Sequence, residues 1–162
     1  MRLSNPLLSV VLATLLTASA GLPGWHPRGG IDPVPQLRLM AITELKAVQG
    51  GHFVTEADIN GSPVTVLVDT GATMVALSYE DAEKVGLKPH ALDFNVPVST
   101  ANGVGKAARV QLRQIMIDNV KVRDVDGLVL QQGVMRGTLL GMSFLSRLRS
   151  FAVEDGKLLL KN

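Results

Sequence analysis

The sequence contains no cysteine and carries almost no excess of either charge. Without a thiol among its 162 residues, the chain can form neither a disulfide framework nor a thiolate metal site. Its 16 Lys and Arg residues against 14 Asp and Glu residues leave a formal charge of +2, too close to neutral to favour nucleic acid or an anionic membrane surface as a partner. The 46% of hydrophobic and 19% of charged residues are typical of a globular protein. The length favours one domain and excludes a two-lobed enzyme of several hundred residues.

The N-terminal segment carries a hydrophobic run that is too short to be a standard membrane span. Residues 7–20 are uncharged and mostly apolar, follow Arg2, and end in Ala18-Ser19-Ala20, which fits a signal-peptidase site. At about 14 residues the run is shorter than the ~20 that a spanning helix needs. We therefore expect residues 1–20 to be a signal peptide or a signal anchor, with a buried helix as the remaining alternative. The rest of the chain would then be exported, either free or tethered to a membrane through residues 3–20.

Residues 21–50 are interpreted as a linker and N-terminal extension. Four Gly and four Pro lie within residues 21–35, a density that favours an extended connection over a packed element. The apolar residues of 36–48 fit either a short helix or a ragged strand, and their spacing does not decide between the two.

Residues 51–162 are expected to form one compact domain made mostly of strands. Phe53, Thr55, Ala57 and Ile59 recur at every second position, and Asn60-Gly61 then supplies the pair with positive φ that closes a type I′ hairpin. Asp118-Asn119 and Asp155-Gly156 are further turn signals. Strand-like runs flank these turns at 64–68, 110–117, 120–129, 151–153 and 158–160.

Two short helices are predicted between the strands. Ser78 is the predicted N-cap of a helix over 79–85, with Asp81 at the capping-box position and Gly86 as the stop. A second helix is predicted over 142–148. The whole pattern predicts an all-β fold, a small closed barrel with one or two short helices.

The segment Leu67-Val68-Asp69-Thr70-Gly71-Ala72-Thr73 places a carboxylate directly after a strand that we expect to be buried. A negative charge there is unfavourable unless something compensates it. One interpretation is structural, an Asx turn in which Asp69 accepts backbone N–H groups. A second is phosphate binding, as in sugar-kinase and actin-like ATPases, but 51–162 is too short for two nucleotide-clamping lobes and no Gly-x-x-x-x-Gly-Lys loop is present. A third is acid–base chemistry by a pair of carboxyl groups.

The same segment resembles the Asp-Thr-Gly-Ala active-site loop of retropepsin-like aspartic proteases. Leu139-Leu140-Gly141 is similar to the hydrophobic-hydrophobic-Gly element that precedes the C-terminal helix of that fold, and residues 98–109 occupy the place of its flap hairpin. The resemblance covers residues 51–160 in order. The chain looks most like the single-domain bacterial members that carry an N-terminal membrane-targeting segment. This resemblance implies that the exported domain lies in the periplasm, either free or anchored to the inner membrane through residues 3–20 and facing the periplasm. The resemblance implies a retropepsin-like barrel and an aspartic endopeptidase that acts on a peptide or protein substrate.

The resemblance also assigns roles by position. Asp69 would be the catalytic residue. The rest of the active-site loop would be Thr70, Gly71 and Ala72. The support behind this loop, out of contact with substrate, would be Leu139, Leu140 and Gly141. The flap would span residues 99–108 and bind substrate through Thr100, Ala101, Asn102 and Gly103.

Peptide hydrolysis by this chemistry needs two carboxyl groups that share one proton, and the chain carries one Asp-Thr-Gly. The nearest imitation, Asp124-Val125-Asp126-Gly127, lacks both the hydroxyl residue and the small residue after glycine. The resemblance therefore implies a C2 homodimer in which each protomer contributes Asp69. The alternative is a non-catalytic envelope module of the same fold that dimerises or binds peptide.

No metal or other cofactor is expected. His26, His52 and His90 are isolated in the sequence, whereas a zinc site needs three or four convergent ligands. No serine stands in a nucleophile setting such as Gly-x-Ser-x-Gly.

Overall fold

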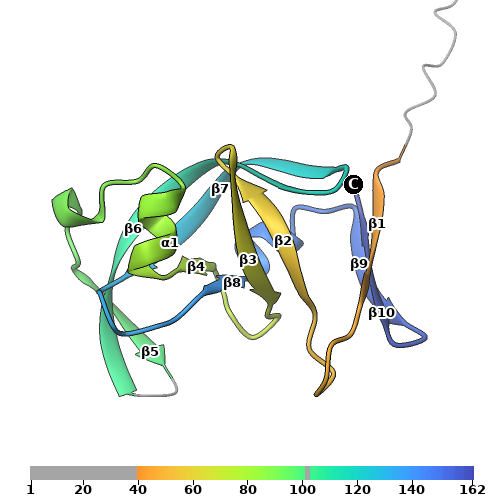
Figure 1. Ribbon diagram of the computed structural model, residues 1–162, viewed down its shortest axis with the longest axis horizontal. Helices are drawn as coiled ribbons and strands as arrows, with labels where there is room; N and C mark the ends of the chain where they lie inside the picture. Colours follow the sequence, from red (N-terminus) through yellow and green to blue (C-terminus); the bar gives the residue numbers. More distant parts are fainter. Residues whose placement is uncertain (1–39, 101–102) are drawn as a thin grey trace, which may run out of the picture. The chain divides into compact units, whose positions relative to one another are not determined.

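The structure, a computed structural model, describes residues 40–100 and 103–162 (Figure 1). The predicted signal segment 1–20 and most of the predicted linker lie outside the described residues. In the described part, the strands are β1 (Ile42–Lys46), β2 (Val54–Ile59), β3 (Ser62–Val68), β4 (Val75–Leu77), β5 (Val96–Thr100), β6 (Gly103–Ile117), β7 (Val120–Leu130), β8 (Thr138–Leu140), β9 (Ser150–Glu154) and β10 (Lys157–Lys161). The helices of the same part are α1 (Tyr79–Lys84), α2 (Met142–Leu145) and a 3-10 turn, η1 (Pro89–Ala91).

Among these described elements, six strands close into a barrel. Neighbouring strands follow the order β2-β3-β8-β4-β7-β6, and β6 also pairs with β2 to complete the ring. β5 pairs only with the first part of β6, and this hairpin projects from the barrel (Figure 1). The predicted fold class, all-β with a small closed barrel and short helices, is therefore confirmed.

Parallel pairings bring the carboxyl ends of two strands together where the site forms. β3 runs parallel to β8, with Val68 opposite Leu140, and β4 runs parallel to β7. β4 and β8 are antiparallel and meet at Ala76 and Leu139. Because the chain leaves β3 at Val68 and β8 at Leu140, the loops that follow these two strands emerge side by side.

A three-stranded sheet, ordered β1-β10-β9, packs beside the barrel. Leu45 of β1 and Leu158 and Leu160 of β10 belong to the hydrophobic core, and the Thr43 hydroxyl donates to the Ile117 carbonyl at 3.2 Å. β1 lies inside the segment 21–50 that we interpreted as linker and extension, so part of that segment belongs to the fold. The undecided pattern of 36–48 is a strand over 42–46.

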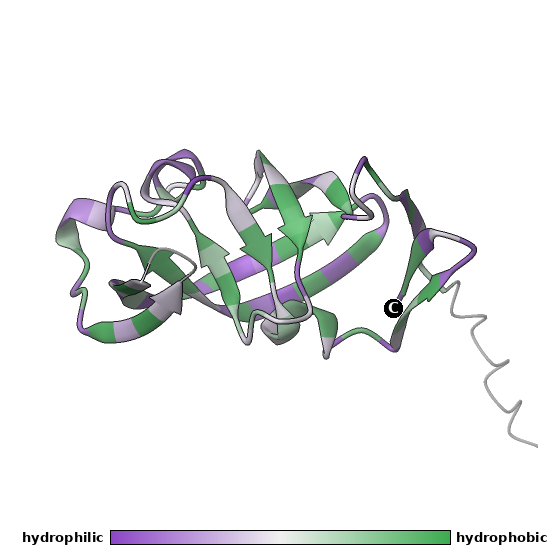
Figure 2. Cartoon of the chain, turned by 90° about the horizontal axis from the view of Figure 1, so that it is seen from below, coloured by the Kyte–Doolittle hydropathy of each residue, from purple (hydrophilic) through white to green (hydrophobic). Residues whose placement is uncertain are grey.

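The structure contains the three turns predicted from Asn60-Gly61, Asp118-Asn119 and Asp155-Gly156. Asn60 has φ 58° and Gly61 has φ 98°, and they join β2 to β3 in antiparallel register. Asp118 and Asp155 also have positive φ, at 49° and 50°. Between the turns, hydrophobic and hydrophilic bands alternate along the long strands (Figure 2). One face of the barrel strands β2, β6 and β7 therefore supplies buried core residues, which include Ile59, Leu112 and Ile117.

The predicted helices form, with two differences in detail. The Ser78 hydroxyl accepts the Asp81 N–H at 3.1 Å, as an N-cap does, and Gly86 follows the helix with φ 79°. The other half of the predicted capping box is absent, since the Ser78 N–H donates to the Gly137 carbonyl at 3.2 Å. The second helix ends at Leu145, shorter than the predicted 142–148. Within the described residues, no helix combines the length and apolarity needed to cross a bilayer.

Candidate active site

Asp69 stands at the first position after β3, in a turn held by backbone hydrogen bonds. The Asp69 N–H donates to the Leu140 carbonyl at 3.2 Å, and the Ala72 N–H donates to the Asp69 carbonyl at 3.3 Å. The Gly71 N–H donates to Oδ1 of Asp69 at 2.8 Å. The Asx turn considered from the sequence therefore exists, but it uses one carboxylate oxygen. The half-buried carboxylate remains at the wall of a cavity.

Gly141 lies against the back of this loop so closely that no side chain fits. A Cβ on Gly141 would lie 2.6 Å from the Ala72 carbonyl oxygen and closer still to that of Met74. The Met142 N–H then donates to the Ala72 carbonyl at 2.8 Å. The start of α2 therefore fixes the backbone of the active-site loop from behind.

Ser143 also ties the loop to the barrel, a role that sequence reasoning missed. Its N–H donates to the Thr73 carbonyl at 3.0 Å, and its hydroxyl accepts the Val75 N–H at 2.9 Å. The same hydroxyl donates to the Asp126 carbonyl at 2.7 Å. The sequence signal that could have indicated this role is a serine in the first turn of the helix that follows Leu139-Leu140-Gly141.

Of the three residues expected behind the active-site loop, Leu140 and Gly141 contact the loop, whereas Leu139 also lines the cavity. Leu140 is fully buried, and its carbonyl receives the Asp69 N–H. Gly141 makes the close backbone contact already described. Leu139, expected only to support the loop, is half-buried and also lines the cavity that holds Asp69.

The cavity beside Asp69 has a volume of about 870 Å³. Its walls are the active-site loop with Gly71, Ala72 and Thr73, strand β5, the loop that joins β7 to β8, and residues of β6 and β7. Asp69 therefore faces a cleft between the barrel and the projecting β5–β6 hairpin.

The hairpin occupies the position expected for the flap. Thr100 lines the cavity, and its hydroxyl donates to the Gly103 carbonyl at 2.8 Å. Gly103 has φ 112°, a conformation that favours glycine. Ala101 and Asn102, the other two predicted flap contacts, lie outside the described residues.

Comparison with known proteins identifies the family to which this arrangement belongs. A family model described as "gag-polyprotein putative aspartyl protease" matches residues 55–147, more than half of the chain. The chain belongs to the retropepsin-like aspartic protease family. The matched segment includes the active-site loop, the hairpin and the start of α2.

The relatives of this retropepsin-like chain include proteins similar in sequence and proteins similar in structure. It is 44% identical over 118 residues to the "Uncharacterized protein in cobV 5'region" of Sinorhizobium sp, covering 73% of this chain and 51% of that one. The chain spans about half the length of the curated relatives it matches. It is 32% identical to a retropepsin-like aspartic protease from Rickettsia conorii, whose crystal structure it matches with a TM-score of 0.68 over 76% of this chain and 92% of that one. EIAV protease complexed with the inhibitor HBY-793 shares the fold, at 19% identity and a TM-score of 0.54, over 68% of this chain and all of that one (100%).

A buried carboxylate, Asp81, links α1 of this retropepsin-like barrel to β8. The residue is 6% exposed, and its carboxylate accepts the Thr138 hydroxyl at 2.9 Å and the Lys84 ammonium at 2.8 Å. Burial acts to raise the pKa of Asp81, but the hydrogen bonds from Lys84, Thr138 and Ser78, with the charge of Lys84, outweigh it and hold the pKa below its usual value. Since Thr138 begins β8, this contact anchors the strand that leads to Leu139, Leu140 and Gly141.

Proposed function

We propose that this protein is an aspartic endopeptidase that works as a C2 homodimer, with Asp69 of each protomer forming the catalytic pair. The observation that carries the proposal is the composition of the cavity wall. Asp69 is the one carboxylate among the described residues that line the cavity. Acid–base hydrolysis of an amide by carboxyl groups needs a second one about 3 Å away, so a second copy of the chain must supply it.

The two carboxyl groups would divide the chemistry through one shared proton. Two like charges at this separation cannot both form easily, so one group stays protonated while the other ionises. The ionised group takes a proton from a bound water as the water oxygen attacks the amide carbonyl. The protonated group gives its proton to the developing oxyanion or to the leaving amine. The pair then titrates as a unit, and neither pKa belongs to one residue.

The loop geometry supports this role for Asp69. The Gly71 N–H holds Oδ1 at 2.8 Å and so orients the carboxylate. Thr70 is exposed at the tip of the loop, where its hydroxyl would bond across the two-fold axis. Ala72 keeps the cleft floor small, and an extended peptide would bind under the β5–β6 hairpin by strand pairing.

We also propose that the chain is exported, through a signal carried by residues 1–20. The apolar run and its small-residue ending support this proposal. If the segment is retained, residues 3–20 tether the protein to the inner membrane with the domain facing the periplasm. The mass of the mature protein and its release by osmotic shock test these two forms, and recovery of the full-length chain in the cytosol would contradict both.

The decisive test of the enzyme compares wild type with Asp69→Asn on an unfolded protein at mildly acid pH. We expect cleavage by the wild type, loss of cleavage in the variant, and inhibition by a statine peptide that mimics the tetrahedral intermediate. Cleavage that survives the substitution contradicts the mechanism. A folded, dimeric wild type that cleaves nothing in a broad peptide library would favour the non-catalytic, peptide-binding module.

A further inference from the structure

We propose that the cleft beside Asp69 selects peptides that carry acidic side chains near the scissile bond, and that Arg109 and Arg136 recognise them. The inference rests on the proposed function, because it names the substrate class of that same site. It begins with the two basic side chains that line the cavity together with Asp69.

The two arginines reach the cleft from different walls. Arg109 lies on β6, opposite Leu128 of β7, and Arg136 lies in the loop between β7 and β8. The guanidinium of Arg109 lies 3.9 Å from the sulfur of Met74, which closely follows the active-site loop. Arg109 therefore lies beside the segment that follows Asp69, and Arg136 lines the same cleft from the loop between β7 and β8.

Neither arginine is neutralised within the described residues. The ion pairs found there join Lys84 to Asp81 and Lys157 to Glu44, and none involves Arg109 or Arg136. Arg136 also lines a neighbouring cavity of about 540 Å³ with Glu80 and Asp81, yet it pairs with neither.

The charge balance of the assembled cleft is consequently positive. Each protomer contributes two guanidinium groups and one carboxyl group to the described cavity wall. In the C2 dimer the two carboxyl groups share a proton, so a single negative charge faces four positive ones. A cleft of one charge sign attracts ligands of the opposite sign and raises their local concentration.

A substrate carboxylate satisfies these arginines better than a neutral side chain does. A planar guanidinium binds a carboxylate through two parallel N–H···O bonds, which are stronger than bonds to a neutral acceptor. The two-fold axis repeats both arginines on either side of the dyad, so acidic side chains are favoured on both sides of the scissile bond. Arginines that contacted only peptide carbonyls would give no such preference.

The test uses matched peptides that differ only as Glu or Gln, scanned through the positions flanking one cleavable bond. We expect a kcat/KM about fivefold to tenfold higher for Glu at the responsive positions, declining as salt is raised. Arg109→Gln and Arg136→Gln should each reduce this ratio, and the double substitution should bring it close to one. Arg109→Lys should retain part of the preference, since the charge remains while the paired geometry is lost.

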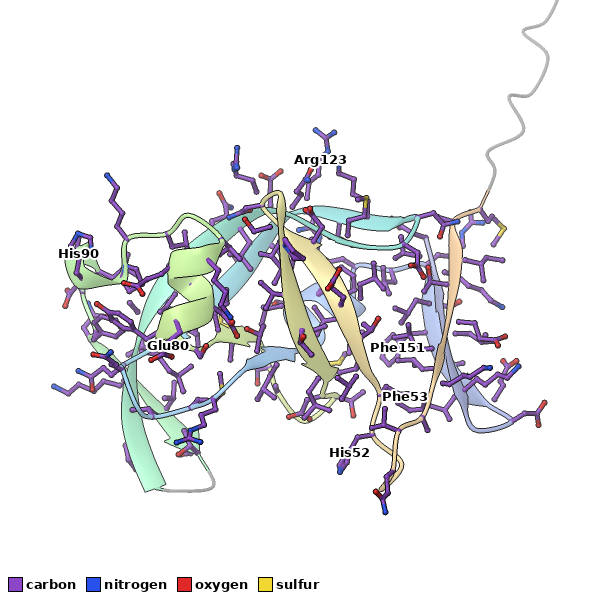
Figure 3. The ribbon with its side chains drawn as sticks, viewed as in Figure 1. His52, Phe53, Glu80, His90, Arg123 and Phe151 are labelled. Carbon is purple, nitrogen blue, oxygen red and sulfur yellow. The ribbon has the colours of Figure 1, made fainter. Side chains whose placement is uncertain are left out.

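Arg123→Gln is the matched control. It removes the same charge from an exposed residue of β7 that lies at the edge of the barrel away from the β5–β6 hairpin (Figure 3). Its Glu to Gln ratio should equal that of the wild type. An equal loss in Arg123→Gln would mean that overall charge, and not the cleft, carries the preference, and would overturn the inference.

A binding measurement separates this inference from the proposed function. Fluorescence anisotropy of non-cleavable, reduced-amide versions of the same peptides reports the charge preference without turnover. Cleavage with no Glu preference overturns the inference about acidic substrates and leaves the proposed endopeptidase function standing. Glu-selective binding that depends on Arg109 and Arg136, without cleavage of any parent peptide, overturns the proposed endopeptidase activity and supports the recognition of acidic side chains by the cleft. Absence of both cleavage and selective binding overturns both.

Discussion

Gly141→Ala should damage this fold far more than an alanine substitution at another closely packed glycine. The new Cβ would collide with the backbone oxygens of Ala72 and Met74, which cannot rotate away as a side chain can. Forcing extra volume into a packed site costs about 1–3 kcal/mol, and backbone neighbours favour the upper end. Displacing α2 would also weaken the Met142 to Ala72 hydrogen bond, worth about 1 kcal/mol.

Gly127→Ala supplies the matched comparison. A Cβ there would lie 3.3 Å from the Val75 carbonyl oxygen, so an adjustment of a few tenths of an ångström relieves it. We therefore expect a loss of about 3–4 kcal/mol in the free energy of unfolding for Gly141→Ala and about 1 kcal/mol or less for Gly127→Ala. Urea denaturation followed by circular dichroism measures both. If Gly141→Ala proves no more destabilising than Gly127→Ala, the close approach described behind the active-site loop is wrong.

Two further predictions concern the supports of the fold. Asp81→Asn should lower the free energy of unfolding by about 1–3 kcal/mol near neutral pH, because the substitution removes the buried negative charge and replaces one of the two acceptor oxygens with an NH2 group. Since the folded pKa of Asp81 lies below its ordinary value of 3.8, the carboxylate stabilises the fold above that pH and the contribution disappears as pH falls through the folded pKa. The difference between wild type and variant should therefore shrink below about pH 4, and a constant difference would refute the assignment. Leu45→Ala should cost about 2–4 kcal/mol because Leu45 is 7% exposed and part of the core, whereas Glu44→Ala on the same strand should cost under 1 kcal/mol. Equal effects in thermal denaturation would exclude β1 from the core.

Much of the barrel could be predicted from local signals. Asn60-Gly61 marks its hairpin because positive φ is needed there. The long runs of β6 and β7 alternate between buried and exposed positions, and this alternation predicts strands. Ser78 and Gly86 mark the ends of α1 for similarly local reasons.

The missed elements depend on contacts distant in sequence. β4 and β8 have three residues each, too few to show a period, and they exist because they pair with β7 and β3. The buried contact between Asp81 and Thr138 joins residues 57 positions apart, so no spacing rule reveals it. The sequence left residues 36–48 undecided between helix and strand because the strand character of β1 comes from pairing with β10 at the other end of the domain.

Some residues of the candidate site could likewise be predicted from a short stretch of sequence, whereas others depend on contacts distant in sequence. Asp69 stands out because a carboxylate follows an apolar strand on a small-residue turn, a feature visible in a short stretch of sequence. Ser143, Arg109 and Arg136 reach the loop or the cleft from three other segments, and only the closed barrel brings them there.

The most direct test of the central claim mixes wild type with Asp69→Asn and allows the subunits to exchange at constant total protein. If each active unit needs Asp69 from both copies, mixed dimers are inactive and activity follows the square of the wild-type fraction, reaching about a quarter at equal parts. If each Asp69 works independently of the other, activity follows the wild-type fraction itself and remains at about half at equal parts. A linear dependence in a sample shown to have exchanged its subunits would contradict the account, and a quadratic one is the result it predicts.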